Sequence, residues 1–531
     1  MFAYSTTALS NAVLVGQQES FVNNLVNISN SQSSSEGEFA GGSAFYCNVF
    51  SDENELSSLS GTAAQVSLTL QHNITLNSNK FLGVNNSAVS QGSYNVGITN
   101  GGSAVYVLAQ CLPGVANSSL LLEDAVVAGN SLQSENDFIQ VLDTEQSLGS
   151  NIGGALMVSA VTNVGSGVVT TEFHDVIFSK NRGLVKDTVV SDIVSTGQAS
   201  ASGPIQNGGA SSYTICSALG VGSCQANIVV NHAIFSGDEF QQQGGRSQTG
   251  LSFIGGGSLF VEAYSFSGPV DTVVRMDDVV VTGCQSIVTG VISQNTHIGG
   301  GFGYWMAFSG MATSQVLAIH NSAFVNNMLQ ATLWGSEGAT YMGGGALFVV
   351  SAGADNAQVP TSLDLQVSDS TFSRSAAMLL NPNATPSPTA SVFCGGGGIF
   401  SFSRNTLGPA TENVTLSQSS FVANAVSISL LNSGTMYAGG GGLYAVTRSL
   451  FSSVLAFSAN AHTTLTGNNA TLLQPNSAIP SGASPVVTFG GGGLFVVSPV
   501  TPSSLVTLSL STVSILENAV QVMLPSVLIP A

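Results

Sequence analysis

The chain has 531 residues, of which 9 are basic and 28 are acidic, so charged side chains make up only 7% and the formal net charge is −19. Nine basic residues cannot form a phosphate footprint, which argues against nucleic-acid binding. The apolar content of 44% argues against disorder. Every apolar run is interrupted before the roughly 20 residues that a transmembrane helix needs, so no membrane span is expected within this chain.

The N-terminal segment lacks the basic stretch of a secretory signal, because the first lysine is Lys80. We therefore expect either a cytosolic protein or a chain whose true start is missing, and the repeats described next favour the second alternative. The sequence after Ile515 stops before another glycine-rich box. Residues 1–531 are accordingly expected to be one continuous repeat domain, an internal fragment of a longer protein.

Two short signatures alternate along the chain, and internal repeats of this kind indicate a stacked architecture. The first signature is a glycine box followed by an apolar segment, and its copies begin at Gly41, Gly101, Gly153, Gly208, Gly255, Gly299, Gly343, Gly395, Gly439 and Gly490. The second is an apolar residue followed three positions later by Asn, and its copies begin at Phe21, Leu76, Val127, Phe178, Phe324, Phe421, Leu465 and Ile515. Three degenerate copies begin at Phe235, Val281 and Phe372.

The second signature recurs every 43 to 57 residues, and each repeat divides into two similar halves. Two halves fit two coils of a parallel β-solenoid, which would have roughly 20 coils and extend about 100 Å at the spacing of β-strands. Helical repeats are excluded because Ser, Asn, Gly and β-branched residues dominate without a 3.6-residue period. A propeller ring of about 4–8 blades does not fit more than ten repeats.

Alternating apolar residues predict strands with one buried face before the second signature, as at Leu363, Leu365 and Val367. The glycine boxes lead into continuous apolar runs such as 347–350. Glycine tolerates the close backbone approach of a tight corner. The recurring Asn can adopt a left-handed conformation at a bend and can stack in ladders.

The alternation of Gly-Gly-Ala-(Ile/Leu/Val) with Phe-x-x-Asn resembles the repeat of chlamydial polymorphic outer membrane proteins. Segments 153–156 and 344–347 match the first motif, and segments 21–24, 178–181, 324–327 and 421–424 match the second. The resemblance implies an all-β, single-stranded right-handed parallel β-helix of the pectin-lyase-like kind. It also implies a surface protein, since the bacterial members are autotransporter passengers and several are adhesins. This chain departs from the family in lacking a signal peptide and the C-terminal strands of an outer-membrane barrel, and in having boxes of up to four glycines.

A polar column is expected just before the second signature in most repeats. Its members are His72, Asn73, Asp124, His174, Asp175, His232, Asp278, His320, Asn321, Asp369 and His462. With two coils per repeat these residues would lie about 10 Å apart, too far to share a metal ion. We therefore favour a column of turn residues over a metal or acid–base row. His174 and Asp175 are adjacent and would point to opposite faces of a strand, and no Gly-x-Ser-x-Gly motif supports a Ser–His–Asp site.

Other charged residues give no clear catalytic pattern. Lys180, Arg182 and Lys186 form the only basic cluster, followed by Asp187 and Asp192, and the favoured interpretation is a solvated loop. An acidic insert contains Glu135, Asp137, Asp143 and Glu145 but lacks a calcium-loop motif. Inserts at 51–60, 131–150, 186–206 and 381–391 lengthen particular turns. We expect with equal weight that these inserts recognise a partner and that they have no binding role.

The six cysteines follow no CxxC spacing, so a zinc site has no support. Cys216 and Cys224 form either a local disulfide or two buried thiols. No catalytic, cofactor-binding or metal-binding residue is therefore assigned, and no cofactor is expected.

The sequence predicts a noncatalytic extracellular or cell-surface protein for adhesion or display, whose partner is an unknown surface protein or glycan. The alternatives are a polysaccharide lyase or hydrolase of the same fold, which would need a base and several acids converging on neighbouring coils, and a purely structural rod.

Overall fold

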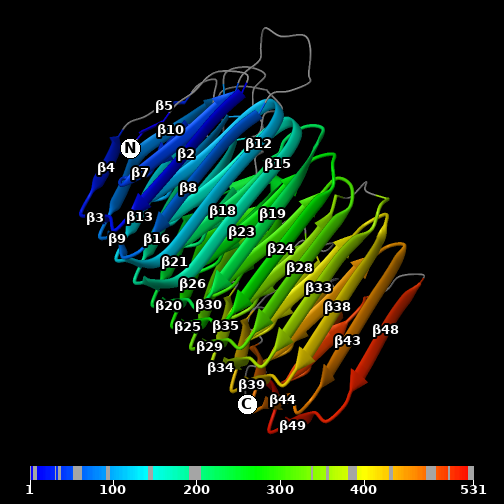
Figure 1. Ribbon diagram of the computed structural model, residues 1–531. Coiled ribbons are helices and arrows are strands. Elements are labelled where there is room, and N and C mark those ends of the chain that lie inside the picture. The colour runs from blue at the N-terminus through cyan, green and yellow to red at the C-terminus, as the bar shows by residue number, and fades with distance from the viewer. Residues whose placement is uncertain are drawn as a thin grey trace, which may run out of the picture.

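The computed structural model describes residues 2–3, 9–29, 32–33, 38–51, 63–90, 96–140, 148–190, 205–244, 246–336, 339–354, 358–380, 391–429, 435–473, 486–499 and 503–523. All regular structure in these residues is β-strand, so the expected all-β class is confirmed. The strands form one sheet of 29 strands and another of 21. Neighbouring strands within each sheet run parallel, as β28 with β33 and β35 with β40 do. The repeats are stacked in chain order, as the colour progression in Figure 1 shows.

One repeat illustrates the path of the chain. After the glycine box at Gly343, strand β32 (Leu347–Gly353) leads outward and β33 (Thr361–Ser368) returns in the same sheet. The short strand β34 (Thr371–Ser373) then reaches a corner, beyond which β35 (Ala376–Leu380) and β36 (Ser391–Gly395) belong to the second sheet. The chain next enters another glycine box and begins the same path again.

Equivalent strands of successive repeats stack in four ladders of the first and second sheets. The outward ladder, which takes one strand from each repeat, is β7 (Phe45–Ser51), β12 (Val105–Ala128), β15 (Leu156–Ser179), β18 (Ser212–Ala218), β23 (Leu259–Ser265), β27 (Gly303–Ser309), β32, β37 (Ile399–Asn405), β42 (Leu443–Ser449) and β47 (Leu494–Val497). The returning ladder is β2 (Leu9–Gln17), β8 (Ala63–Gln71), the later parts of β12 and β15, β19 (Gly222–Asn231), β24 (Val270–Asp277), β28 (Thr313–His320), β33, β38 (Pro409–Ser417), β43 (Ser452–Asn460) and β48 (Ser504–Leu510). Short strands β3 (Ser20–Val22), β9 (Ile74–Asn77), β20 (Ile234–Ser236), β25 (Val280–Thr282), β29 (Ala323–Val325), β34, β39 (Ser420–Val422), β44 (Thr464–Thr466) and β49 (Ser514–Leu516) continue the returning ladder.

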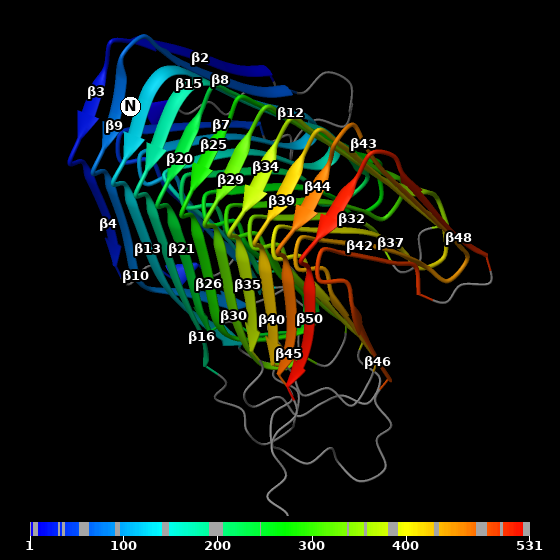
Figure 2. The same ribbon diagram turned by 90° about the horizontal axis from the view of Figure 1, so that it is seen from below.

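The second sheet combines the strands after the corner with those before the glycine box. The former are β4 (Leu25–Ser29), β10 (Lys80–Ser90), β13 (Ser131–Gln140), β16 (Arg182–Val190), β21 (Glu239–Gly244), β26 (Gln285–Gly299), β30 (Met328–Ser336), β35, β40 (Ala425–Ser429), β45 (Asn469–Leu473) and β50 (Ala519–Met523). The latter are β6 (Glu38–Gly41), β11 (Val96–Gly101), β14 (Leu148–Gly153), β17 (Ile205–Gly208), β22 (Arg246–Gly255), the end of β26, β31 (Thr340–Gly343), β36, β41 (Thr435–Gly439) and β46 (Val486–Gly490). Figure 2 shows the short strands of the first sheet and the strands after the corner as two rows that meet along one line.

Each repeat contributes one layer of the stack, so the expectation of two coils per repeat and roughly 20 coils is wrong. The apolar residues of the second signature pair directly with each other, for example Phe324 with Phe372 and Phe372 with Phe421. The eleven in-register residues are Phe21, Leu76, Val127, Phe178, Phe235, Val281, Phe324, Phe372, Phe421, Leu465 and Ile515. At about 4.8 Å per layer the stack is roughly 50 Å long rather than 100 Å.

The two types of strand reflect different burial. The returning strand β33 alternates buried and less buried residues, with Leu363, Leu365 and Val367 inside, as expected. The outward strand β32 is buried on both faces: Leu347 belongs to the core between the outward and returning strands, and Phe348 belongs to a second core against the strands that precede the glycine box. Continuous apolar runs are typical of parallel strands covered on both sides.

The glycine boxes are required by close packing between layers. Gly344 has φ of 72°, and a Cβ placed there would lie 1.9 Å from the carbonyl oxygen of Leu347. L-amino acids with a side chain rarely adopt this conformation, and no side chain fits at that distance. The glycine at this position therefore allows the chain to turn directly from the second sheet into the outward strand.

Candidate functional site

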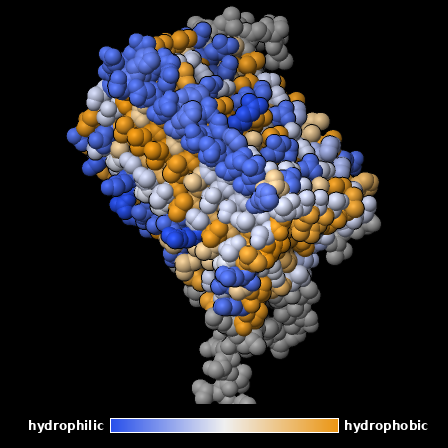
Figure 3. All heavy atoms as spheres, turned by 60° about the horizontal axis from the view of Figure 1, so that its bottom comes forward, coloured by the Kyte–Doolittle hydropathy of each residue, from blue (hydrophilic) through white to orange (hydrophobic). Residues whose placement is uncertain are grey.

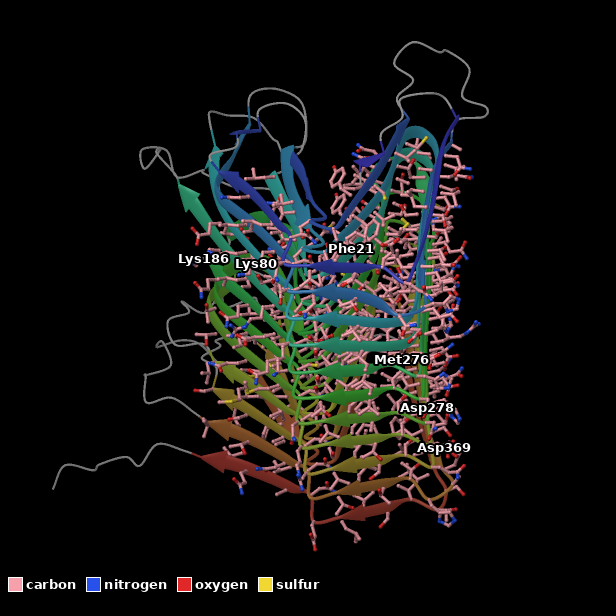
Figure 4. All side chains as sticks on the ribbon, turned by 60° about the vertical axis from the view of Figure 1, so that its left-hand side comes forward. Phe21, Lys80, Lys186, Met276, Asp278 and Asp369 are labelled. Atoms are coloured by element: carbon pink, nitrogen blue, oxygen red, sulfur yellow. A yellow bond between two sulfur atoms is a disulfide. The ribbon has the colours of Figure 1, made fainter. Side chains whose placement is uncertain are left out.

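The polar column expected near the second signature lies at the turn between the returning strand and the short strand. Its backbone is left-handed at nearly every layer, with positive φ at His72, Asn73, Asp124, Asp175, His232, Asp278, Asn321, Asp369, Ala461 and His462. Asn and Asp tolerate this conformation better than other residues with side chains. Figure 4 shows Asp278 and Asp369 at the same outer edge of the stack. The interpretation as a column of turn residues agrees with this geometry.

The column residues are neighbours, and the expected separation of about 10 Å is wrong. His232 lies between two carboxylates of adjacent layers, with Nδ1 3.9 Å from Asp175 Oδ1 and Nε2 3.6 Å from Asp278 Oδ2. His320 Nδ1 lies 3.5 Å from Asp369 Oδ2. All of these side chains are largely exposed, so the pairs are surface ion pairs when the imidazole is protonated, and such pairs are worth little. In the part of the chain that the structure describes, no three His, Cys, Asp or Glu side chains are grouped to hold a metal ion.

His174 and Asp175 do not act together. His174 Nε2 faces Glu172 Oε2 at 3.4 Å, and its Nδ1 lies 3.2 Å from the side-chain amide of Asn231. Asp175 instead belongs to the left-handed turn. The adjacent pair is therefore not a catalytic dyad, in line with the expectation that the two side chains diverge.

The basic cluster is distributed over cross-layer ion pairs. Lys186 Nζ donates to Glu135 Oε1 at 2.8 Å, and this bond lowers the pKa of Glu135. Arg182 Nη2 donates to Glu239 Oε2 at 3.1 Å. Figure 4 places Lys80 and Lys186 on the side of the second sheet, away from Asp278. Arg182 and Lys186 thus make inter-layer contacts on β16 rather than lying in the solvated loop that we expected, whereas Lys180 is exposed in the turn before β16.

The acidic insert lies partly outside the described residues. Asp137 lies on β13, whereas Asp143, Glu145 and Asp192 lie outside the described residues, as does most of the insert at 381–391. Asp187 is buried and accepts hydrogen bonds from the side-chain amides of Gln242 at 2.8 Å and Asn207 at 3.3 Å. Within the described residues these acids do not form a calcium loop.

The asparagines of the second signature form a buried hydrogen-bonded ladder. Asn79 donates from its backbone and side-chain nitrogens to Asn130 Oδ1, both at 3.0 Å. Asn130 donates in the same way to Asn181 Oδ1, at 3.1 and 3.0 Å. Most of these side chains also donate to a backbone carbonyl of the preceding layer, as Asn130 does to Leu76 at 2.8 Å. This ladder satisfies the backbone at the corner and is structural.

One ladder position holds a carboxylate. Asp238 replaces Asn and accepts hydrogen bonds from Ser211 Oγ at 2.7 Å, Ser258 Oγ at 2.8 Å and the backbone of Asn181 at 2.9 Å. Burial raises its pKa to about 6, against the opposing effect of these donors. Asp238 has no exposed surface, so it cannot contact a substrate.

Two further carboxyls and one histidine are buried inside the stack, and sequence reasoning missed them. Burial raises the pKa of Glu412 to about 8, while Thr447 Oγ1 at 3.0 Å and the Ser401 hydroxyl donate to it. Burial also raises the pKa of Glu262 well above its usual range and lowers that of His297 well below. The sequence offered a signal for Glu412, which occupies an inward-facing position of an alternating strand, but not for Glu262 and His297, which lie in continuously buried segments. None of the three reaches the surface.

Cys216 and Cys224 form a disulfide, which decides between the two alternatives left open by the sequence. The bond closes the turn between β18 and β19 in one layer. The remaining cysteines, Cys47, Cys111, Cys284 and Cys394, are buried and not disulfide-bonded. They show no spacing or exposure that suits a reactive site.

A row of exposed apolar side chains, which we call the apolar ridge, lies at the turns between outward and returning strands. It comprises Leu219, Val221, Phe266, Met311, Leu407, Leu450 and Phe451, whose exposed fractions range from 44% to 69%. Figure 3 shows hydrophobic and hydrophilic residues gathered in bands along the stack on the face it presents. The turn amides already bond between layers, as from Phe266 to the carbonyl of Ala218 at 3.0 Å and from Leu450 to that of Thr406 at 3.2 Å. A partner can therefore cover the ridge without leaving these backbone N–H groups unpaired.

Comparison of the chain with family models, with curated proteins and with solved structures finds no match. Within the described residues no helix has the length and hydropathy needed to cross a membrane.

Proposed function

We propose that the chain is a right-handed parallel β-helix that acts as a noncatalytic cell-surface or extracellular protein in adhesion or display. The proposal extends the observed parallel stack to a helical path with one coil per repeat. The resemblance of the two alternating signatures to surface-protein repeats supports both the fold and the location. The observation that carries the function is the apolar ridge.

Exposed apolar side chains are normal when scattered, but large ones gathered on one surface mark an interaction surface. The ridge has two phenylalanines, a methionine and several aliphatic residues at the turns of three successive layers and, beyond the layer of β32 and β33, of two more. The paired backbone beneath it lowers the cost of removing water. A partner surface that covers the ridge would gain about 25 cal/mol for each Å² of apolar area buried.

The disulfide supports an oxidising compartment, because such bonds persist in secreted and surface proteins and are rare in the cytosol. The chain could meet external partners in that location. A low-charge surface of Ser, Thr and Asn would keep the stack in solution there.

The rival enzymatic function has weaker support. In the described residues the exposed carboxylates of the turn column lie beside histidines, and the carboxyls with raised pKa are buried. A polysaccharide-cleaving site needs an acid and a base within reach of one substrate. Because the carboxyls with raised pKa, which would serve as acids, are out of reach of a substrate, binding has the stronger support.

The test measures attachment of beads coated with the protein to a panel of cultured cells and immobilised matrix proteins. A triple variant with Phe266, Leu450 and Phe451 changed to Ser should attach at least several-fold less, while circular dichroism and thermal unfolding stay unchanged because these side chains are exposed. A matched control changes exposed apolar residues on another face, Val126 and Ile177, to Ser. Equal attachment by the ridge variant and the wild type would contradict the role of the ridge. Absence of attachment together with filament assembly would favour a structural rod.

A further inference from the structure

The turns that carry the apolar ridge lie in a row along one edge of the stack (Figure 1). The row begins before the ridge itself, because Gly114 pairs with Gly165 and Gly165 with Gly222 at the equivalent turns. Val115 and Val164, which are 40% and 41% exposed, continue the apolar surface into these two layers. From the layer of β12 to that of β42 the edge is roughly 30 Å long at about 4.8 Å per layer.

Buried serines satisfy the backbone of the ridge turns from within the protein. The hydroxyl of Ser309 accepts a hydrogen bond from the amide of Met311 at 2.7 Å and donates to the carbonyl of Gly268, in the preceding layer, at 2.5 Å. Equivalent pairs of bonds are made by Ser265 and Ser449. All three serines are fully buried. Turn groups that water could otherwise satisfy are therefore paired with the interior of the stack.

Internal pairing of this kind matters most where water is excluded. An unpaired N–H or C=O group is costly to bury, and the cost is greatest in the hydrocarbon of a bilayer, which offers no hydrogen-bonding partner. The turns that carry Phe266, Met311 and Phe451 have part of this requirement already met by the serines and by the inter-layer amide bonds. They can therefore enter a medium without water more easily than ordinary exposed turns can.

The charges beside the ridge are complementary to lipid phosphate. Within three positions of a ridge residue the sequence has two charged residues, and both are basic, Arg404 and Arg448. The chain as a whole has 28 acidic residues and only 9 basic ones. Both arginines are partly exposed, and guanidinium groups bind phosphate well. Asp355, in the turn of the layer of β32 and β33, lies outside the described residues.

The shape of the ridge also favours a lipid surface over a protein. Phe266 and Phe451 are 65% and 67% exposed at the tips of turns, so they project from an edge. Protein interfaces centre on anchors that fill pockets and are ringed by further contacts that exclude water. A row only one or two side chains wide has no such ring. A fluid bilayer accommodates a projecting row without a complementary groove.

We infer that the apolar ridge is a docking edge for the surface of a lipid bilayer with zwitterionic headgroups. The ridge side chains enter the boundary between headgroups and acyl chains, about 5–10 Å deep, and the stack lies along the membrane. The net charge of −19 disfavours strongly anionic membranes. The assignment rests on the proposed function in adhesion or display and names the partner that the ridge meets.

The first test is flotation of the whole chain with vesicles of phosphatidylcholine. The wild type should float with the vesicles. The triple variant with Phe266, Leu450 and Phe451 changed to Ser should bind at least about tenfold more weakly, because most of the apolar area of two turns is lost. The matched control, Val126→Ser with Ile177→Ser on another face, should bind like the wild type. No flotation of the wild type, or equal flotation of the triple variant, would overturn the assignment.

A second test measures insertion directly. Phe451→Trp should show a blue shift of its added fluorescence when vesicles are present, and phosphatidylcholine with brominated acyl chains should quench that fluorescence. Val126→Trp should show neither effect. Phe266→Leu with Phe451→Leu should bind within about threefold of the wild type, because a bilayer requires apolar area rather than the shape of a ring. A Phe451→Trp signal that brominated lipid leaves unchanged would refute insertion.

Bead attachment separates this inference from the proposed function. Beads that attach to immobilised matrix proteins through the ridge, while the protein fails to bind vesicles, would refute the lipid edge and leave adhesion standing with a protein partner. Vesicle binding through the ridge, without attachment of coated beads to any cell or matrix protein, would support the lipid edge and refute adhesion.

Discussion

Removal of one side chain from the interior of the asparagine ladder should destabilise the protein strongly. Asn130→Ala deletes the acceptor of the backbone and side-chain nitrogens of Asn79 and the donor to the carbonyl of Leu76. Three buried polar groups lose a partner, and each buried group left unsatisfied costs about 1–3 kcal/mol. Because Asn130 has no exposed surface, water cannot replace the amide without a cavity. We expect a loss of about 4 kcal/mol in the free energy of unfolding, or loss of the folded state.

The matched control is Asn24→Ala at the first layer. Asn24 donates one side-chain hydrogen bond, to Asn79 Oδ1 at 2.8 Å, and its side chain is only partly buried. Water can satisfy the groups left behind, so the loss should stay near or below about 1 kcal/mol. Urea unfolding followed by circular dichroism compares the two variants, and hydrogen exchange at the amide of Asn79 reports local opening. Similar losses for both variants, or unchanged protection of Asn79 in Asn130→Ala, would refute the argument that burial makes the ladder costly to break.

Three further predictions follow from particular residues. Reduction of the Cys216–Cys224 disulfide should lower the free energy of unfolding by about 2.5 kcal/mol, which is the loss of chain entropy expected for a loop this short. Thiol titration in denaturant should detect two more thiols after reduction than before. Detection of six thiols in the unreduced protein would contradict the disulfide. The pKa of Glu412 in the folded protein is raised to about 8 from 4.5, so the folded state binds the proton more tightly than the unfolded state does. The free energy of unfolding should therefore fall by about 1.4 kcal/mol per pH unit as the pH rises between these values. Glu412→Gln should remove this slope in urea titrations at several pH values, and a slope that persists in the variant would show that another group causes it. Gly344→Ala should lower the free energy of unfolding by well over about 3 kcal/mol or prevent folding, because the new Cβ would overlap backbone atoms. Gly283 also has a positive φ, of 66°, but a Cβ there would meet no atom within 4 Å, so Gly283→Ala should cost about 1 kcal/mol. Equal melting temperatures for the two variants would show that the glycine box can relax around a side chain.

The local features were predictable because each depends on a short stretch of sequence. Alternation at Leu363, Leu365 and Val367 predicts one buried face, and the structure buries these residues. Glycine at position 344 predicts a left-handed backbone conformation, which residues with a side chain rarely adopt, and the structure shows a positive φ at Gly344. The polar residues before the second signature predict a turn, and the turn is present at Asp278.

The number of layers was not predictable from the repeat length. A repeat of about 50 residues with two halves suits either two short coils or one long coil, because both arrangements bury the same apolar positions. The choice depends on which residues pair across layers. Phe324 pairs with Phe372 rather than with a residue half a repeat away, and this contact is not local.

Buried polar groups were missed for a related reason. Glu412 follows the alternation of its strand as an inward residue, yet sequence alone gives no reason to expect the hydroxyls of Ser401 and Thr447 around it. Those hydroxyls come from the outward strands of the same layer and of the next. An acid at an inward position of such a repeat is therefore a reason to look for hydroxyl residues at the facing positions.

With one layer per repeat, residues at the same repeat position are immediate neighbours on the surface, and this changes how the sequence can be used. Tyr264, Phe308, Ala352, Arg404 and Arg448 each lie nine positions after the first glycine of a box, at Gly255, Gly299, Gly343, Gly395 and Gly439. Aligning the boxes therefore gives the order of side chains along a surface row of the stack. Under a two-coil arrangement the same residues would be separated by intervening coils and would not be neighbours. The pairing of successive repeats thus identifies which side chains, far apart in the sequence, are neighbours in the stack.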